Sequence, residues 1–363
     1  MSHENIVDQF NHVAFKSAAQ MVNMCLDARI VPLVKGSPGM GKSALAAFIA
    51  KTRNLFLIDL RLAQCDVTDL IGFPFMDHST KLASYYPLDT FPITSTPLPL
   101  KADGTQYSGW LLMLDELTSA RQDIQAASYK LILDRMVGNH RLHDKVFVMA
   151  AGNLETDNAI VEPMSTALTS RMAHIYMRVD KADFESWAYS EGDIDSRIMA
   201  FLGWKPNFLY NFKPESTYDT YACPRTWEFV SRIIKAAGKI DANTRNLVCG
   251  LIGKAVGTEF CSFVKIVDEL PNLDLVFTNP HGAPLPDMGR PDMQYATVTA
   301  LSQRCNASNM DQAIHYIRRL PQEMQMIMVK MTLLNKTNEE KLAISQSEVF
   351  REWRNQMSKV VHG

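Results

Sequence analysis

Long hydrophobic runs are missing from this sequence of 363 residues. A membrane-spanning helix needs about 18 or more apolar residues in a row. The longest apolar stretches, at 110–114 and 146–151, have the length of buried strands. The opening MSHENIVDQF carries Glu4 and Asp8, where a secretory signal would place basic and then apolar residues. We therefore expect a soluble, cytoplasmic protein without a membrane partner.

A surplus of charge of either sign is missing as well. Lys plus Arg total 37 and Asp plus Glu total 39, which gives a formal charge of −2. No global positive field is available to collect nucleic acid or anionic lipid, although local basic patches remain open. The 47% hydrophobic and 21% charged residues exclude wholesale disorder, and the length predicts two or three compact units.

Recognisable metal-binding and disulfide patterns are also lacking. No C-x-x-C pair occurs among the six cysteines, so reduced thiols in cores are favoured over disulfides or a zinc site. No pair of histidines has the H-E-x-x-H spacing. This disfavours a metal site other than magnesium at the histidines that attract notice, which are His78, His140, His143 and His174.

Strands alternating with helices fill the first half of the chain. Five apolar segments predict strands, at 30–34, 55–59, 110–114, 146–151 and 174–179. Helical spacing of apolar residues occurs at 3–29, 43–51 and 121–136. Such alternation predicts an α/β domain with a central parallel five-stranded sheet. From Lys181 onward only helical segments follow, at 182–190, 195–202, 224–238, 241–256, 310–334 and 346–358.

These patterns predict three regions. The α/β core covers 1–180, a helical domain covers 181–278, and a proline-rich loop with a helical C-terminal extension covers 279–363. A proline-rich stretch at about 72–109 is too long for a simple connection and is interpreted as a functional insert without a helix of its own. The insert and the loop at 136–144 offer residues for contact with a partner, namely Tyr85, Tyr86, His140 and His143.

A glycine-rich segment follows the first predicted strand and opens the next helix. It fits the pattern G-x-x-x-x-G-K-[ST] and comprises Gly36, Ser37, Pro38, Gly39, Met40, Gly41, Lys42 and Ser43. Its backbone N–H groups and the helix N-terminus would wrap phosphate oxygens. Lys42 would pair with the β and γ phosphates, and the Ser43 hydroxyl would bind magnesium. An ordinary glycine-rich turn is the alternative, which the flanking strand and helix disfavour.

Three polar residues are expected beside this loop. Asp115 and Glu116 follow the strand at 110–114, and Asn153 follows the strand at 146–151. Asp115 would hold Mg²⁺ through water, Glu116 would orient the attacking water, and Asn153 would hydrogen-bond the γ phosphate or that water. In isolation these would be ordinary strand-end residues. The second carboxylate, Glu116, favours a hydrolase over a small-molecule kinase.

Two arginines, a methionine-rich run and the segment NKTNEE each allow more than one interpretation. Arg171 and Arg225 are single arginines, which are more often surface charges than ligands, and the pattern alone does not rank them. The methionines in MQMIMVKM, at 324–331, fit core packing better than a promiscuous groove. The segment NKTNEE, at 335–340, departs from the guanine-reading N-K-x-D, so ATP is favoured over GTP.

The order of these motifs resembles the AAA+ ATPases, and specifically their MoxR-like branch. The segments that carry the resemblance span nearly the whole chain: GSPGMGKSAL, CDVTDLIGFP, LLMLDELTSA, VMAAGNLETDNAIV, MSTALTSRM, CPRTWEFVSRII and YIRRLPQEMQ. Many relatives have asparagine and arginine after the acidic pair and phenylalanine after the finger arginine. This chain departs from them with Thr118, Ser119 and Met172.

The resemblance implies roles for single residues. Asn153 would be the sensor 1 residue, Arg171 the arginine finger that reaches a neighbouring subunit's nucleotide, and Arg225 the sensor 2 arginine on the helical lid domain at 181–278. The stretch at 72–109 would be the helix 2 insert. The resemblance also implies a homo-oligomeric ring, usually a hexamer.

Three functions follow as hypotheses. The first is an ATP-hydrolysing ring that acts as a chaperone or remodelling motor on a separate protein with a von Willebrand factor A domain. The second is a nucleic-acid motor, which the neutral charge disfavours. The third is a nucleotide-gated scaffold, which has no use for the complete hydrolytic set of Glu116, Asn153 and Arg171.

Overall fold

The computed structural model describes residues 12–79, 81–157, 162–214, 220–268, 270, 273–334 and 336–361. The first part of the helix predicted at 3–29 lies outside these residues. The chain divides into two compact units. The first contains the residues up to Asp183 together with 213–216, and the second contains 184–212 and the residues from 217 onward.

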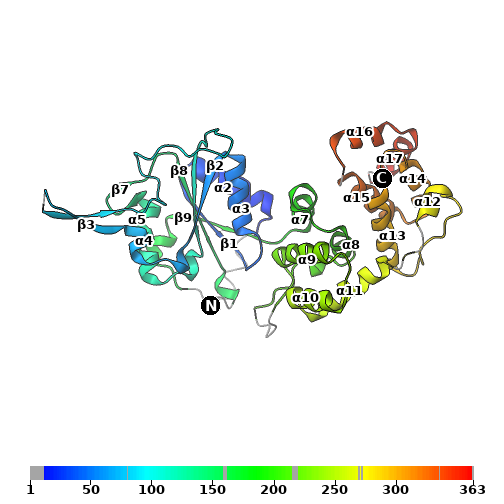
Figure 1. The fold of residues 1–363 in the computed structure, drawn as a ribbon, viewed down its shortest axis with the longest axis horizontal. Helices are drawn as coiled ribbons and strands as arrows, with labels where there is room; N and C mark the ends of the chain where they lie inside the picture. Colours follow the sequence, from blue (N-terminus) through cyan, green and yellow to red (C-terminus); the bar gives the residue numbers. More distant parts are fainter. Residues whose placement is uncertain are drawn as a thin grey trace. The chain divides into compact units, whose positions relative to one another are not determined.

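A five-stranded parallel sheet forms the centre of the first unit (Figure 1). Its strands are β1 (Val31–Lys35), β2 (Leu55–Arg61), β5 (Gly109–Asp115), β8 (Val146–Gly152) and β9 (Met172–Tyr176). They lie in the order β2-β5-β8-β1-β9, and every pair is parallel. The predicted fold class, a phosphate-loop α/β core with a five-stranded sheet followed by a helical region, is confirmed.

Both faces of this sheet are buried, which explains why its strands are continuous apolar runs. In β5, Leu112 and Leu114 belong to one core, whereas Leu111 and Met113 belong to the other. Successive side chains of a strand point to opposite faces, so the run WLLML contributes to both cores. The helices that cover the first core are α4 (Val67–Ile71), α5 (Gln122–Leu133) and α6 (Thr166–Thr169); those of the second are α2 (Phe15–Asp27) and α3 (Lys42–Thr52).

Several predicted boundaries move. The last strand begins two residues earlier than predicted, at Met172, because it pairs with β1 from Val31 onward, and Met177 forms a bridge with Val13 instead. The helix predicted at 121–136 ends at Leu133, because Arg135 adopts a positive φ of 56° that no helix continues.

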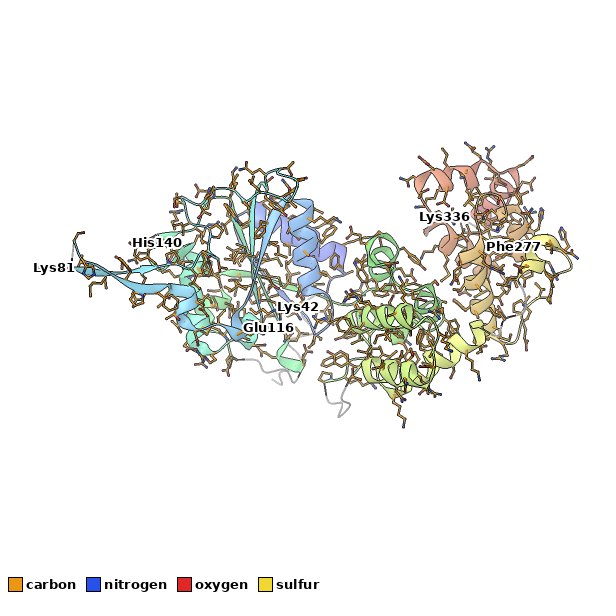
Figure 2. The ribbon with its side chains drawn as sticks, in the orientation of Figure 1. Lys42, Lys81, Glu116, His140, Phe277 and Lys336 are labelled. Atoms are coloured by element: carbon orange, nitrogen blue, oxygen red, sulfur yellow. The ribbon has the colours of Figure 1, made fainter. Side chains whose placement is uncertain are left out.

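The proline-rich insert contains an antiparallel hairpin that the sequence did not predict. Its strands are β3 (Phe73–Asp77) and β4 (Leu82–Tyr86). A shorter hairpin follows at β6 (Met136–Val137) and β7 (His140–Arg141). Figure 2 shows Lys81 at the tip of the β3–β4 hairpin. Side chains of this hairpin are exposed, with Phe75 at 56% and Leu82 at 65%.

The described part of the second unit is helical. Its elements up to residue 278 are α7 (Lys181–Trp187, which starts in the first unit), η4 (Ala188–Gly192), α8 (Ser196–Trp204), η5 (Pro206–Phe208), α9 (Pro224–Ala237), α10 (Ala242–Ile252), α11 (Lys254–Asp268) and α12 (Asp274–Thr278). The single helix predicted at 241–256 is wrong: Gly253, with a φ of 87°, separates α10 from α11.

The remaining helices of the second unit form the C-terminal region. They are α13 (Pro291–Arg304), α14 (Met310–Ile317), α15 (Gln322–Leu334), α16 (Asn338–Gln346) and α17 (Glu348–Val361). The helix predicted at 310–334 is interrupted before Pro321, which cannot donate a helical hydrogen bond. Met324, Met328 and Met331 are buried, which confirms core packing for this run, whereas Met326 is exposed. The division of this unit into a lid and an extension stays a prediction.

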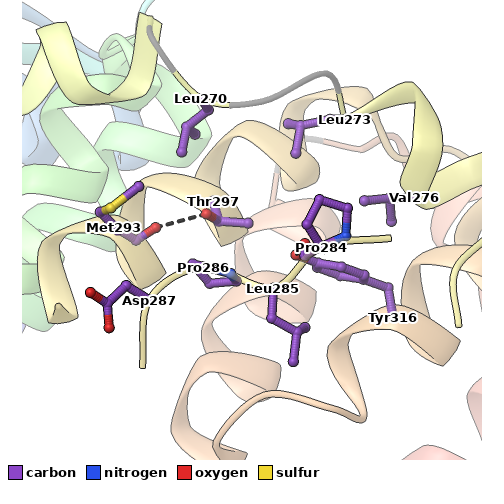
Figure 3. A pocket seen from close by; sticks show the side chains of 10 residues that line it. All are labelled: Leu270, Leu273, Val276, Pro284, Leu285, Pro286, Asp287, Met293, Thr297 and Tyr316. Atoms are coloured by element: carbon purple, nitrogen blue, oxygen red, sulfur yellow. Dashed lines mark hydrogen bonds between the residues drawn. The ribbon is translucent and has the colours of Figure 1, made fainter. Parts of the chain in front are cut away.

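A small cavity of about 110 Å³ lies under the loop before α13 (Figure 3). Apolar side chains such as Leu273 and Val276 line it, with the Asp287 carboxylate at one side. The Tyr316 hydroxyl holds the loop by donating to the Pro284 carbonyl at 2.9 Å. None of the sequence-predicted site residues lines this cavity.

Within the described residues, no helix has both the length and the apolar character to cross a membrane. All six cysteines are free thiols: Cys25, Cys65, Cys223, Cys249, Cys261 and Cys305. Burial raises the pKa of Cys305 to about 12 and that of Cys261 to about 11. These two thiols are therefore poor nucleophiles at neutral pH.

Candidate functional site

The glycine-rich segment connects the end of β1 to the start of α3. Gly39 and Gly41 have φ values of 78° and 96°, in the left-handed region that glycine adopts without a steric penalty. Gly41 is the N-cap of α3, which begins at Lys42. The first N–H groups of a helix have no acceptor within the helix. The loop therefore presents backbone donors and a positive helix end, which fits the binding of a phosphate group.

Lys42 joins this loop to the end of β8. Its Nζ donates to Asn153 Oδ1 at 2.9 Å and to the Ser37 carbonyl at 3.2 Å, and it also contacts the Gly36 carbonyl. The Gly36 N–H in turn donates to the Gly152 carbonyl at 3.3 Å. The structure thus brings together two of the predicted residues, Lys42 and Asn153, that lie far apart in the sequence.

Ser43 and Asp115 also meet. The Ser43 hydroxyl donates to Asp115 Oδ2 at 3.2 Å, and Asp115 is 8% exposed at the end of β5. A hydroxyl and a carboxylate are hard oxygen ligands, so the pair fits Mg²⁺. Asp59, on the neighbouring strand β2, adds negative charge: burial raises its pKa, and the charge of Asp115 raises it further.

Glu116 adopts an unusual backbone conformation. Its φ of 58° and ψ of 29° lie in the left-handed region, which costs a non-glycine residue about 1–3 kcal/mol. The Glu116 N–H donates to Asp115 Oδ1 at 2.9 Å, which helps to hold this turn. Figure 2 labels Glu116 and Lys42 in the same part of the first unit. Backbone strain of this kind is concentrated at functional sites.

Two residues that sequence reasoning did not assign to the site hold Asn153. The Thr118 hydroxyl accepts the Asn153 N–H at 2.8 Å and donates to the Asn153 carbonyl at 3.3 Å. A Cβ atom on Gly152 would come within 2.5 Å of Thr118 Cγ2, so only glycine allows this approach. In the sequence, Thr118 stands out only as a departure from the family that the chain resembles.

Asp157 is a further residue that the sequence did not reveal. It is 6% exposed, and its Oδ1 accepts the Ser37 hydroxyl at 2.8 Å. Burial raises the pKa of the Asp157 carboxyl, while hydrogen bonds from Ser37 and Leu154 and the charge of Lys42 oppose that rise. Its local pattern, ETD, is that of a solvated loop, and the long-range contact with Ser37 has no sequence signal.

Arg171 is not brought to this group of residues. Its guanidinium lies 5.1 Å from the centroid of the Tyr129 ring, and Nη1 donates to the Ala167 carbonyl at 2.9 Å. Strand β9 pairs with β1 from Val31 opposite Met172, so Arg171 precedes the start of β1 whereas the glycine-rich loop follows its end. Five residues at about 3.3 Å each separate the two by roughly 16 Å.

Arg225 lies in the first turn of α9, in the second unit, and its side chain is exposed. Its relation to a nucleotide stays a prediction.

The β3–β4 and β6–β7 hairpins of the first unit contact each other. His140 Nε2 lies 3.1 Å from the Tyr85 carbonyl, and the centroids of the His140 and Tyr86 rings are 5.9 Å apart. His143 packs against Trp110, and its Nδ1 accepts the Lys145 N–H. His140 and His143 thus contact residues of their own unit, while Tyr85 and Tyr86 remain exposed at 41% and 52%.

The sequence matches no known protein-family profile and no curated protein. A solved structure from Cytophaga hutchinsonii, named provisionally as an ATPase, is 12% identical over 97% of this chain and 90% of its own, with a TM-score of 0.34. Two variants of Thermotoga maritima RuvB are 13% and 14% identical, with a TM-score of 0.38 each. They cover 89% and 84% of this chain, and 90% and 87% of their own. The fold assignment rests on the sheet order and the glycine-rich loop of this chain.

Proposed function

We propose that this chain binds and hydrolyses ATP with Mg²⁺. The observation that carries the proposal is the meeting of three strand ends: Lys42 bonds Asn153, and Ser43 bonds Asp115. In parallel sheets, ligands bind at the carboxyl ends of the strands. Here that edge carries a cation, a Mg²⁺-compatible oxygen pair and the carboxylate of Glu116, whose backbone is strained. A cation, a metal site and a carboxylate are the parts that phosphoryl transfer to water requires.

The residues would act through position and charge. The N–H groups at the start of α3 and the Lys42 ammonium bind the phosphate oxygens. Ser43 and Asp115 hold the Mg²⁺, which offsets the charge of the β and γ phosphates when bound. Glu116 accepts a hydrogen bond from the attacking water and aligns it with the bond that breaks, between the γ phosphorus and the β–γ bridging oxygen. Asn153 holds the γ phosphate or the water.

At a finer level, the chain is an AAA+ ATPase of MoxR-like type that forms a ring. The resembling segments support this, and so does the exposure of Arg171 at the end of the strands opposite to its own glycine-rich loop. An arginine in that place serves a neighbouring subunit's nucleotide. Arg225 acts as the sensor 2 residue, and nucleotide-dependent movements of its helical domain transmit force to a partner protein.

The partner is a separate protein with a von Willebrand factor A domain. This part of the proposal rests on the sequence resemblance. Adding such a protein, encoded near this one, should stimulate ATP hydrolysis. If none binds the purified ATPase or changes its rate, the assignment of the partner is withdrawn, and stimulation by DNA that weakens steeply with salt would indicate a nucleic-acid motor instead.

The first test is the rate of ATP hydrolysis per subunit as a function of protein concentration. A shared finger predicts that this rate rises cooperatively with concentration, and the proposed Mg²⁺ site predicts that it vanishes when Mg²⁺ is chelated. A matched control is Arg178→Ala, since Arg178 is a 55% exposed surface arginine of the same unit. A rate that does not depend on concentration, with Arg171→Ala as active as Arg178→Ala, would remove the ring mechanism.

A further inference from the structure

A buried carboxylate lies beside the proposed site without a part in the hydrolytic steps. Asp157 is 6% exposed and belongs to the turn η3 (Glu155–Asp157) that follows Asn153. Each of its oxygens has a different partner: Oδ1 accepts the Ser37 hydroxyl at 2.8 Å, and Oδ2 accepts the Leu154 N–H at 3.2 Å. One side chain thus bonds both the glycine-rich loop and the residue next to Asn153.

These bonds form part of a closed circuit. Ser37 is bonded through its hydroxyl to Asp157 and through its carbonyl to Lys42. Lys42 continues to Asn153, whose neighbour Leu154 returns to Asp157. Ser37 is 6% exposed and its hydroxyl donates to Asp157, so this hydroxyl serves the circuit rather than a phosphate.

Under the proposed function, nucleotide binding breaks one side of the circuit, the bond from Lys42 to Asn153, and leaves the other, the bond from Ser37 to Asp157. Lys42 must leave its carbonyl and amide acceptors to bind phosphate oxygens, because its Nζ has three donors and already contacts three oxygens here. The link from Ser37 to Asp157 involves no phosphate-binding group and persists. A bond to a buried carboxylate is strong and directional, so it can hold two loops in register.

We propose that Asp157 is a positioning residue that couples the glycine-rich loop to Asn153, so that the placement of Asn153 follows the loading of the loop. This rests on the proposed function and adds a residue to it. Asp157 does not touch nucleotide; it fixes Asn153 relative to the γ phosphate. Loss of the link should therefore lower kcat for ATP hydrolysis while leaving nucleotide affinity nearly unchanged.

The experiment compares Ser37→Ala, Asp157→Ala and the double variant with the wild type. The matched control is Ser128→Ala, which removes a fully buried hydroxyl of the same unit that donates to the Gln125 carbonyl. For each protein, kcat and the Kd of a non-hydrolysable ATP analogue are measured well below the melting temperature. Thermal stability is recorded in parallel, since all four variants lose a buried hydrogen bond.

We expect kcat to fall about tenfold or more in Ser37→Ala and in Asp157→Ala, with Kd within about threefold of the wild type. The double variant should be no slower than Asp157→Ala, because both changes break one link. Ser128→Ala should lose stability but keep its kcat.

Two results would overturn the inference: a kcat of Ser37→Ala equal to that of Ser128→Ala, or a weakened Kd with unchanged kcat. If Asp157→Ala does not fold, the comparison of kcat between Ser37→Ala and Ser128→Ala still tests the inference. A wild type that does not hydrolyse ATP would refute the proposed function itself, which is a distinguishable outcome.

Discussion

The two ends of the central sheet carry different parts of the proposed machinery. At the carboxyl end, Lys42 donates to Asn153 at 2.9 Å, and Ser43 donates to Asp115 at 3.2 Å. At the amino end, Arg171 is exposed and rests on the Tyr129 ring. The groups at the carboxyl end are hydrogen-bonded in pairs and at least partly buried, whereas Arg171 at the amino end presents an exposed cation to its surroundings.

This difference teaches how one chain can hold an incomplete site. The carboxyl end has the groups that bind and align, but a further cation is what stabilises charge in the transition state of phosphoryl transfer. In the proposed ring, the amino end of one subunit completes the carboxyl end of the next. Assembly would then control the reaction. The predictions below change one end at a time.

The largest effect is expected for Arg171→Ala. Removing a finger arginine lowers the rate of hydrolysis by about 10³-fold or more, without loss of nucleotide binding. Mixing this variant with Lys42→Ala, which lacks the phosphate cation but keeps Arg171, should restore part of the activity. Two inactive variants that stay inactive when mixed, under conditions where they assemble together, would contradict a shared site.

Glu116→Gln should lower kcat about 10²- to 10³-fold, since the amide cannot accept the water's hydrogen bond as a carboxylate does. ATP should still bind, because the phosphate-binding groups are intact; a binding isotherm checks this. Asp123→Asn is the control, as Asp123 is an acidic residue of the same unit whose side chain is 52% exposed. A drop in the control of similar size would show that negative charge in general, not Glu116, is required.

Thr118→Val should lower kcat roughly tenfold, because the new side chain has the same shape but cannot bond the backbone of Asn153. Thr118→Ser keeps the hydroxyl and should recover most of the rate. Steady-state kinetics of both variants measure the effect. A valine variant as fast as the wild type, together with a slower serine variant, would mean that the methyl group packed on Gly152, not the hydrogen bond, matters here.

The smallest effect is expected for Tyr129→Leu. The ring supports the Arg171 guanidinium by a cation–π contact worth about 0.5–1 kcal/mol at exposed sites. The rate of the assembled protein should fall about two- to fivefold, and adding the change to Arg171→Ala should cost nothing further. A double variant slower than Arg171→Ala alone would place Tyr129 in another role.

Much of the first unit was predictable from local pattern. The run WLLML is apolar throughout because both faces of its strand are buried. The glycine-rich loop is recognisable because its backbone conformation requires glycine at fixed spacings. The hairpin of the insert was missed because prolines and polar residues obscure its alternation. The helical spacing of apolar residues continues across Gly253 and Pro321. A prediction from spacing alone therefore merged α10 with α11 and α14 with α15.

The sequence by itself determined the five strands of the central sheet, the glycine-rich loop, and the polar residues at the ends of β5 and β8. These depend on neighbours in the chain, which a pattern records. Only the tertiary structure decided that Lys42 meets Asn153, that Thr118 and Asp157 hold the loops, and that Glu116 is strained. Such contacts join residues up to 120 positions apart, and their geometry depends on how the sheet is ordered and packed.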